Sequence, residues 1–144
     1  MRHWFAVAVC AVLLSVLSPA RADNVQQFGA YTIYYNAFNA GMLDARVAKA
    51  YKLGHGCGHG ALTVAVRTHD GGSVNAKVNA VVTNLIGQRS TIDMHEVRDG
   101  KVVYYVGGFG IANDGDPLKI MVRVHVPGMA GEKSFDVSQE FYRC

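Results

Sequence analysis

The sequence predicts an all-β fold: an antiparallel, immunoglobulin-like β-sandwich of about seven strands, with one short helix after the first strand. Large apolar residues recur at every second position in most segments, and turns rich in glycine and aspartate separate these segments. Each segment has one apolar and one polar face, which is typical of antiparallel sheets rather than buried parallel ones. Half of the 144 residues are hydrophobic and only three are proline, so a disordered chain is excluded.

The first 22 residues are predicted to be a secretory signal peptide. A basic start precedes an apolar run over 4–17, and Ala20-Arg21-Ala22 fits an A-x-A cleavage site. The run is shorter than the roughly 20 apolar residues that span a bilayer. Cleavage after Ala22 would remove Cys10 and leave a single β-sandwich domain, residues 23–144. We expect this domain in the periplasm, with no membrane association after cleavage.

The first strand of that domain is expected at 31–36, and a short helix is expected at 44–51. The helical segment contains alanines and lacks the alternation of a strand. Asp44 can cap its first turn, and Gly54 can end it. We expect the helix to pack over one end of the sandwich.

Six further strands follow from the same alternation of apolar and polar residues. Glycine-containing turns lie between them, and Asp99-Gly100 is a strong hairpin signal. The glycines of 107–110 are expected to mark a bulge or a close approach of two segments. The six strands are expected at 62–67, 74–80, 91–98, 101–106, 118–126 and 135–141.

Aromatic residues crowd the first strand: Tyr31, Tyr34, Tyr35 and Phe38. Tyrosine buries a large apolar area and keeps a polar tip, so these residues suit either a core edge or a binding surface. We favour packing in the core and at the sandwich edge, because a domain of this size first needs apolar area inside.

Several short segments, in order along the chain, share a recognisable pattern: 28–31, 34–39, 47–51, 84–88, 100–105 and 138–142. Together they resemble a family of small exported bacterial proteins known only as a domain of unknown function, number forty-four twenty-six. The resemblance implies a periplasmic, compact, β-rich domain and no assigned activity. Members tend to carry Pro-Glu where this chain has Ala45-Arg46, and a basic stretch in place of 54–60. The resemblance therefore implies no role for the histidines of 54–60.

The segment His55-Gly-Cys57-Gly-His59 is the most unusual feature of the chain. It offers two imidazoles and one thiolate, a ligand set that suits copper or zinc. A structural zinc site needs a fourth ligand, and none is identifiable nearby. The alternative is a surface loop with solvated histidines.

Cys57 has a second use, because Cys57 and Cys144 are the cysteines that remain after signal removal. An even number of cysteines in an oxidising compartment favours a disulfide. Such a bridge would join residues 87 positions apart (144 − 57) and take the thiolate away from any metal. Two free thiols and a bridge between two molecules are the alternatives.

Charge and motifs argue against nucleic acid binding and against catalysis. Removing Arg2 and Arg21 from the 14 basic residues leaves 12 against 11 acids, without a basic patch. The sequence has no nucleophile elbow and no evident pair of carboxylates for acid–base chemistry. Asn113-Asp114-Gly115-Asp116 has oxygen ligands of the calcium type, but a turn is the better interpretation.

These features predict a periplasmic, non-catalytic binding or interaction domain. The expected partner is an envelope protein or a small ligand, and no cofactor is required. The alternative is a copper- or zinc-binding protein that uses His55, Cys57 and His59.

Overall fold

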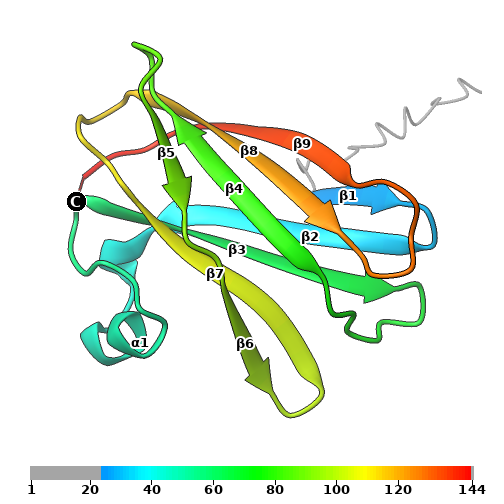
Figure 1. Cartoon of the computed structure of the whole chain (residues 1–144). Helices are drawn as coiled ribbons and strands as arrows, with labels where there is room; N and C mark the ends of the chain where they lie inside the picture. The colour runs from blue at the N-terminus through cyan, green and yellow to red at the C-terminus, as the bar shows by residue number, and fades with distance from the viewer. Residues whose placement is uncertain (1–23, 144) are drawn as a thin grey trace, which may run out of the picture.

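Two antiparallel β-sheets pack face to face in the computed structural model, which describes residues 24–143 (Figure 1). The five-stranded sheet has the order β1 (Val25–Phe28), β2 (Tyr31–Asn39), β3 (His59–Thr68), β7 (Val102–Gly110) and β6 (His95–Asp99). The four-stranded sheet has the order β5 (Arg89–Ile92), β4 (Lys77–Thr83), β8 (Pro117–His125) and β9 (Lys133–Glu140). The predicted β-sandwich is therefore confirmed. The predicted signal peptide lies outside the described residues.

The alternation of residues decides which side of each strand faces the interior. In β8, Leu118, Ile120 and Val122 point into the sandwich and are almost fully buried, while Lys119 and Arg123 on the opposite face are exposed. The inward residues of both sheets form one central hydrophobic core. Stacking two amphipathic sheets in this way removes both apolar faces from water.

The short helix is α1 (Ala45–Ala50), preceded by the 3-10 turn η1 (Ala40–Met42). Asp44 caps α1 as expected, because its Oδ1 accepts a hydrogen bond of 2.8 Å from the backbone N–H of Arg46. The helix covers part of the outer face of the five-stranded sheet, where Ala48 packs in a second hydrophobic cluster with Ala61 and Val106. No helix among the described residues is long and apolar enough to cross a membrane.

The strands number nine within the described residues rather than about seven. β1 was not expected, and the segment 91–98 contains parts of two strands in different sheets. β5 pairs with β4, whereas β6 pairs with β7 in the opposite sheet. The chain crosses between the sheets at residues 93–94, beside Gly107, where a Cβ atom would lie 2.7 Å from the carbonyl oxygen of Asp93. The close approach expected near this glycine is confirmed.

The aromatic residues of β2 divide between the two faces of their sheet. Tyr35 points inward, with its ring centroid 4.8 Å from that of Phe135. Phe38 packs against the cluster under α1. Tyr34 points outward and is 44% exposed. Packing is therefore confirmed for Tyr35 and Phe38, while Tyr34 is not a core residue.

Candidate binding site at one end of the sandwich

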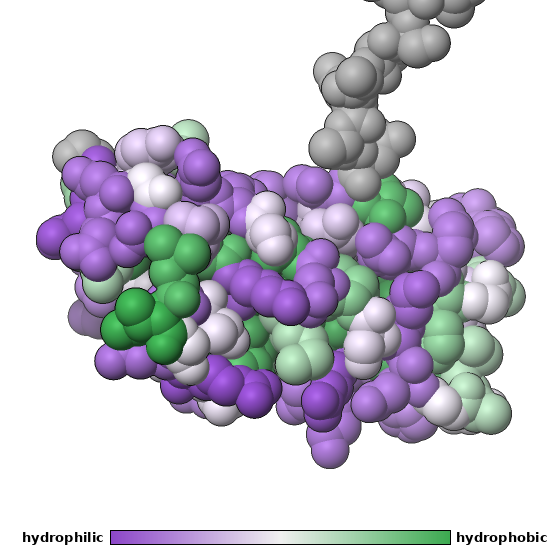
Figure 2. All heavy atoms as spheres, turned by 90° about the horizontal axis from the view of Figure 1, so that it is seen from above, coloured by the Kyte–Doolittle hydropathy of each residue, from purple (hydrophilic) through white to green (hydrophobic). Residues whose placement is uncertain are grey.

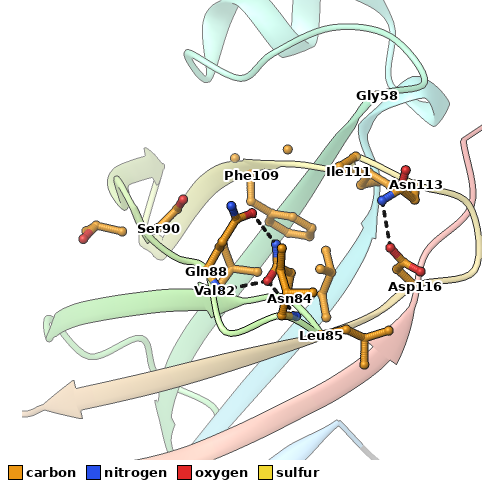
Figure 3. Close-up of a pocket in the computed structure, with 16 residues that line it drawn as sticks. Gly58, Val82, Asn84, Leu85, Gln88, Ser90, Phe109, Ile111, Asn113 and Asp116 are labelled. Carbon is orange, nitrogen blue, oxygen red and sulfur yellow. Dashed lines mark hydrogen bonds between the residues drawn. The ribbon is translucent and has the colours of Figure 1, made fainter.

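A pocket of about 570 Å³ opens at one end of the sandwich, between the β4–β5 loop and the β7–β8 loop (Figure 3). Its floor is the edge of the central core, formed by four apolar residues that are each less than a tenth exposed: Val82, Phe109, Ile111 and Leu118. Its rim is polar and includes Asn84, Gln88, Ser90, Thr91, Asn113 and Asp116. An apolar floor inside a polar rim is typical of ligand sites, and the volume lies within their usual range.

Phe109 is positioned by a glycine on the neighbouring strand. Gly60 of β3 is its partner in the sheet, and a Cβ atom on Gly60 would collide with the Phe109 ring. The ring also meets Phe141 edge-on, with centroids 5.2 Å apart and planes at 74°. Both contacts hold the ring in one orientation at the bottom of the pocket.

The β4–β5 loop, residues 84–88, is held by the side chain of Asn84. Its Oδ1 accepts hydrogen bonds from the backbone N–H groups of Ile86 (3.2 Å) and Gln88 (2.9 Å). Its Nδ2 donates to the Gln88 Oε1 at 2.8 Å, as Figure 3 shows. Gly87 completes the turn with a φ of +82°, a conformation that glycine adopts without strain.

Two aliphatic side chains stand at the tip of this ordered loop. Leu85 is 67% exposed and Ile86 is 79% exposed, and both line the mouth of the pocket. Figure 2 shows a compact hydrophobic cluster, surrounded by hydrophilic residues, towards the end of the molecule at which the β4–β5 loop lies. We call Leu85 and Ile86 the aliphatic tip.

The opposite rim is the turn 113–116, which is tied to the end of the chain. Asn113 Nδ2 donates to Asp116 Oδ2 at 3.0 Å, and Asp114 Oδ1 accepts from the backbone N–H of Arg143 at 2.6 Å. Gly115 has a φ of +75°, and its N–H donates to the carbonyl oxygen of Phe141 at 2.9 Å. The prediction of a turn at these residues is confirmed.

The residues of the predicted metal site lie near this end of the molecule without forming a cluster of ligands. His55 and His59 are exposed, Cys57 is half-buried, and the His59 ring packs against the backbone of Gly54. Among residues 24–143, no group of three His, Cys, Asp or Glu side chains is arranged to hold a metal ion. The structure therefore does not bring the three predicted ligands together.

The backbone at Cys57 lies close to the backbone at Tyr142. Asn39 Nδ2 donates to the carbonyl oxygens of both Cys57 (3.4 Å) and Tyr142 (2.6 Å). A Cβ atom on Gly58 would lie 3.3 Å from the guanidinium group of Arg143. Cys144 itself lies outside the described residues, so its pairing with Cys57 stays a prediction.

Sequence reasoning did not identify the pocket, because four separate stretches of chain line it. The sequence contains one local signal: the aliphatic pair Leu85-Ile86 lies between Asn84 and Gly87. Asparagine and glycine are typical of turns, and the other side chains of a turn are usually polar.

Comparisons with known proteins identify the family of the chain and a solved structure with a similar fold. A sequence profile described as "Domain of unknown function (DUF4426)" matches residues 25–143. The crystal structure of a DUF4426 family protein from Pseudomonas aeruginosa PAO1 has a TM-score of 0.72 and 24% identity, over 83% of this chain and 94% of that chain. The Lin-41 filamin domain reaches a TM-score of 0.38 at 13% identity, over 76% of this chain and 93% of that chain. That score is too low to support an inference, and no curated protein matches the chain.

Proposed function

Because the chain belongs to the DUF4426 family, to which no activity is assigned, we propose its function from the geometry of the site. The protein is an exported, non-catalytic binding domain of the bacterial envelope. Its pocket and aliphatic tip together receive a hydrophobic segment of a partner protein.

The exposed, ordered aliphatic tip is the observation that carries this function. Leu85 and Ile86 are displayed on a loop that three side-chain hydrogen bonds of Asn84 already hold in place. Burying an aliphatic side chain of this size contributes about 1.5–3 kcal/mol. Because the loop is ordered before binding, less conformational entropy is lost when a partner covers it.

The shape of the site favours a protein over a small molecule. A ligand confined to the pocket would contact Phe109 and Val82 on the floor but would leave most of the tip in water. A larger partner can place one apolar side chain in the pocket and cover Leu85 and Ile86 at the same time. This arrangement of a central apolar anchor inside a polar rim is usual in protein interfaces.

The charge of the lining defines the partner further. Asp116 is the one charged residue among the described residues that line the pocket. A carboxylate at the rim disfavours an acidic segment and favours a neutral or basic one. The apolar surface and amide groups of the lining suit binding, whereas acid–base catalysis needs positioned titratable groups.

Site-specific photo-crosslinking in the native bacterium tests the proposal. A photoreactive residue replaces Ile86 in one variant and Met42 in the other, because Met42 is 81% exposed and does not line the pocket. We expect a discrete adduct with an envelope protein from position 86 and none from position 42. Addition of Leu85→Ser to the first variant should reduce that adduct at least tenfold.

Two results would contradict the proposal. One is the absence of an adduct from position 86, and the other is the same set of adducts from both positions. Export is tested in the same cells, because the processed protein should be released with the periplasmic fraction. Recovery of the unprocessed chain in the cytosol would contradict that part.

A further inference from the structure

We propose a second binding site, on the outer face of the five-stranded sheet, for a small organic anion with a flat apolar body. The site is a trough of about 600 Å³ beside β1, away from the pocket at the end of the sandwich. Its walls are the rings of Tyr34 and Tyr104, its base is Ala65, and Arg67 supplies its charge.

Strand alternation places these residues together on the outer face. Tyr34 of β2 pairs directly with Ala65 of β3. On the other side Val64 pairs with Tyr105 of β7, so the antiparallel register continues with Ala65 beside Tyr104. Neighbouring strands lie about 4.8 Å apart, so the two tyrosines stand roughly 10 Å from each other. The short side chain of Ala65 leaves the space between them open.

The trough is the part of this face that α1 leaves uncovered. Val106, the next outward residue of β7 after Tyr104, is buried in the cluster under the helix. Tyr51, at the end of α1, contacts Tyr104 through a hydroxyl–hydroxyl hydrogen bond of 2.9 Å and an edge-to-face ring contact. These contacts hold the Tyr104 ring upright as one wall. Tyr34, 44% exposed, forms the other wall.

Charge complementarity selects an anion. Arg67 is the one cation that lines the trough, and no acidic residue lines it within the described part of the chain. The guanidinium carbon lies 5.4 Å from the centroid of the Tyr34 ring, so the group is stacked on that wall. A stacked guanidinium keeps its edge free to donate paired hydrogen bonds, which a carboxylate accepts in a matching geometry.

The apolar walls select the body of the ligand. An inorganic anion would use Arg67 alone and leave Tyr34, Ala65 and Tyr104 in water. A flat ligand ring that lies on Ala65 buries its apolar area against Ala65 and against the two tyrosine rings. It can contact each tyrosine ring face-on or edge-on. The pocket at the end of the sandwich has the opposite charge, because it contains Asp116 and no cation among its described lining residues. The two sites therefore select different ligands.

Titration of isotope-labelled protein, residues 23–144, by NMR tests the site, with 2-naphthoate as the probe. We expect saturable shifts of amides in 63–67 and 102–104, and weaker binding of the neutral analogue 2-naphthamide. Arg67→Gln should reduce the affinity for 2-naphthoate about tenfold, as the loss of one charge-assisted contact does, and leave that for 2-naphthamide unchanged. Arg123→Gln, exposed on the other sheet, is the matched control and should bind like the natural protein.

A second variant separates shape from charge. Ala65→Leu fills the base of the trough and should weaken both probes, and Arg67→Gln tests the site if this variant fails to fold. Three results would overturn the proposal: shifts confined to residues around Leu85 and Phe109, equal affinity for both probes, or complete competition by inorganic phosphate at equal concentration. The last result would mean that Arg67 is only a general anion contact.

Discussion

The side chain of Asn84 holds one rim of the candidate site in place. Its three side-chain hydrogen bonds lie within a turn that is otherwise held by the backbone bonds between Asn84 and Gln88 and between Gly87 and Asn84. Asparagine is frequent in turns because its short amide reaches backbone groups two residues on. Here that property holds the aliphatic tip in place.

Replacing this residue should loosen the tip. We expect Asn84→Ala to lower the free energy of unfolding by about 1–2 kcal/mol, the usual net value of a few partly exposed hydrogen bonds. Urea unfolding measures the change, and Asn79→Ala, an exposed asparagine on β4, is the control. The role of Asn84 would be refuted if both variants were equally stable.

Tyr104 makes the stability depend on pH at the alkaline end. The hydrogen bond with Tyr51, together with burial and nearby negative charge, raises the pKa of Tyr104 from 10.0 to about 12. Between these values the folded protein keeps a proton that the unfolded chain has lost. This contribution is therefore complete below pH 10 and is lost as the pH rises towards 12.

Removal of the Tyr104 hydroxyl should flatten that dependence. Tyr104→Phe is expected to lose less of its unfolding free energy between pH 10 and pH 12 than the natural protein. Denaturant unfolding at several pH values measures it, with Tyr34→Phe as the control on the same face. An unchanged slope in Tyr104→Phe would show that other groups cause the loss.

Among the strands, the pairing of β3 with β7 positions Phe109 on the floor of the pocket. Gly60 and Gly110 are both glycines near the same end of this pair, and they differ in what surrounds them. A Cβ atom on Gly60 would collide with the Phe109 ring, whereas one on Gly110 would have nothing within 4 Å. Only the first glycine is required by packing.

Alanine should therefore destabilise the protein at the first position but not at the second. Gly60→Ala is expected to lower the unfolding free energy by about 1–3 kcal/mol, because the Phe109 ring must leave its position against Phe141. Gly110→Ala should be neutral or slightly stabilising, because alanine restricts the unfolded chain. Thermal unfolding of the pair measures the difference. Equal melting temperatures would be inconsistent with this role for Gly60.

The strands also show where alternation is a sufficient guide and where it is not. The segments around β3, β4, β8 and β9 were predicted because alternation depends only on neighbouring residues. The segment 91–98 was predicted as one strand, since its residues do not reveal that Ile92 pairs in one sheet and His95 in the other. The switch depends on Gly107, which is far away in the sequence and makes room for the crossing.

For the molecule as a whole, the end of the chain returns to the start of β3. Asn39 donates hydrogen bonds to the carbonyl oxygens of Cys57 and Tyr142, and Tyr142 lies two residues before Cys144, the predicted partner of Cys57. A bridge between them would close a loop of 87 residues (144 − 57). In the loop-entropy model, closure of that size contributes about 4–5 kcal/mol.

Reduction should therefore lower the stability of the protein. We expect residues 23–144 to have an intact mass two daltons below that of the reduced form, and to lose several kcal/mol of unfolding free energy on reduction. Cys57→Ser and Cys144→Ser should each remove the effect of reductant. A natural protein with unchanged mass and stability after reduction would exclude the bridge.

Patterns in the sequence were sufficient to predict the β-sandwich, the short capped helix, the turn at 113–116 and the resemblance to the DUF4426 family. Each depends on patterns that lie within a few consecutive residues, such as alternation, a capping aspartate or a glycine-rich turn. Tertiary structure alone decided the crossing between sheets, the pocket at the sandwich end and the trough between Tyr34 and Tyr104. These features form where separate strands meet, and their contacts depend on strand order and register, which local patterns do not specify.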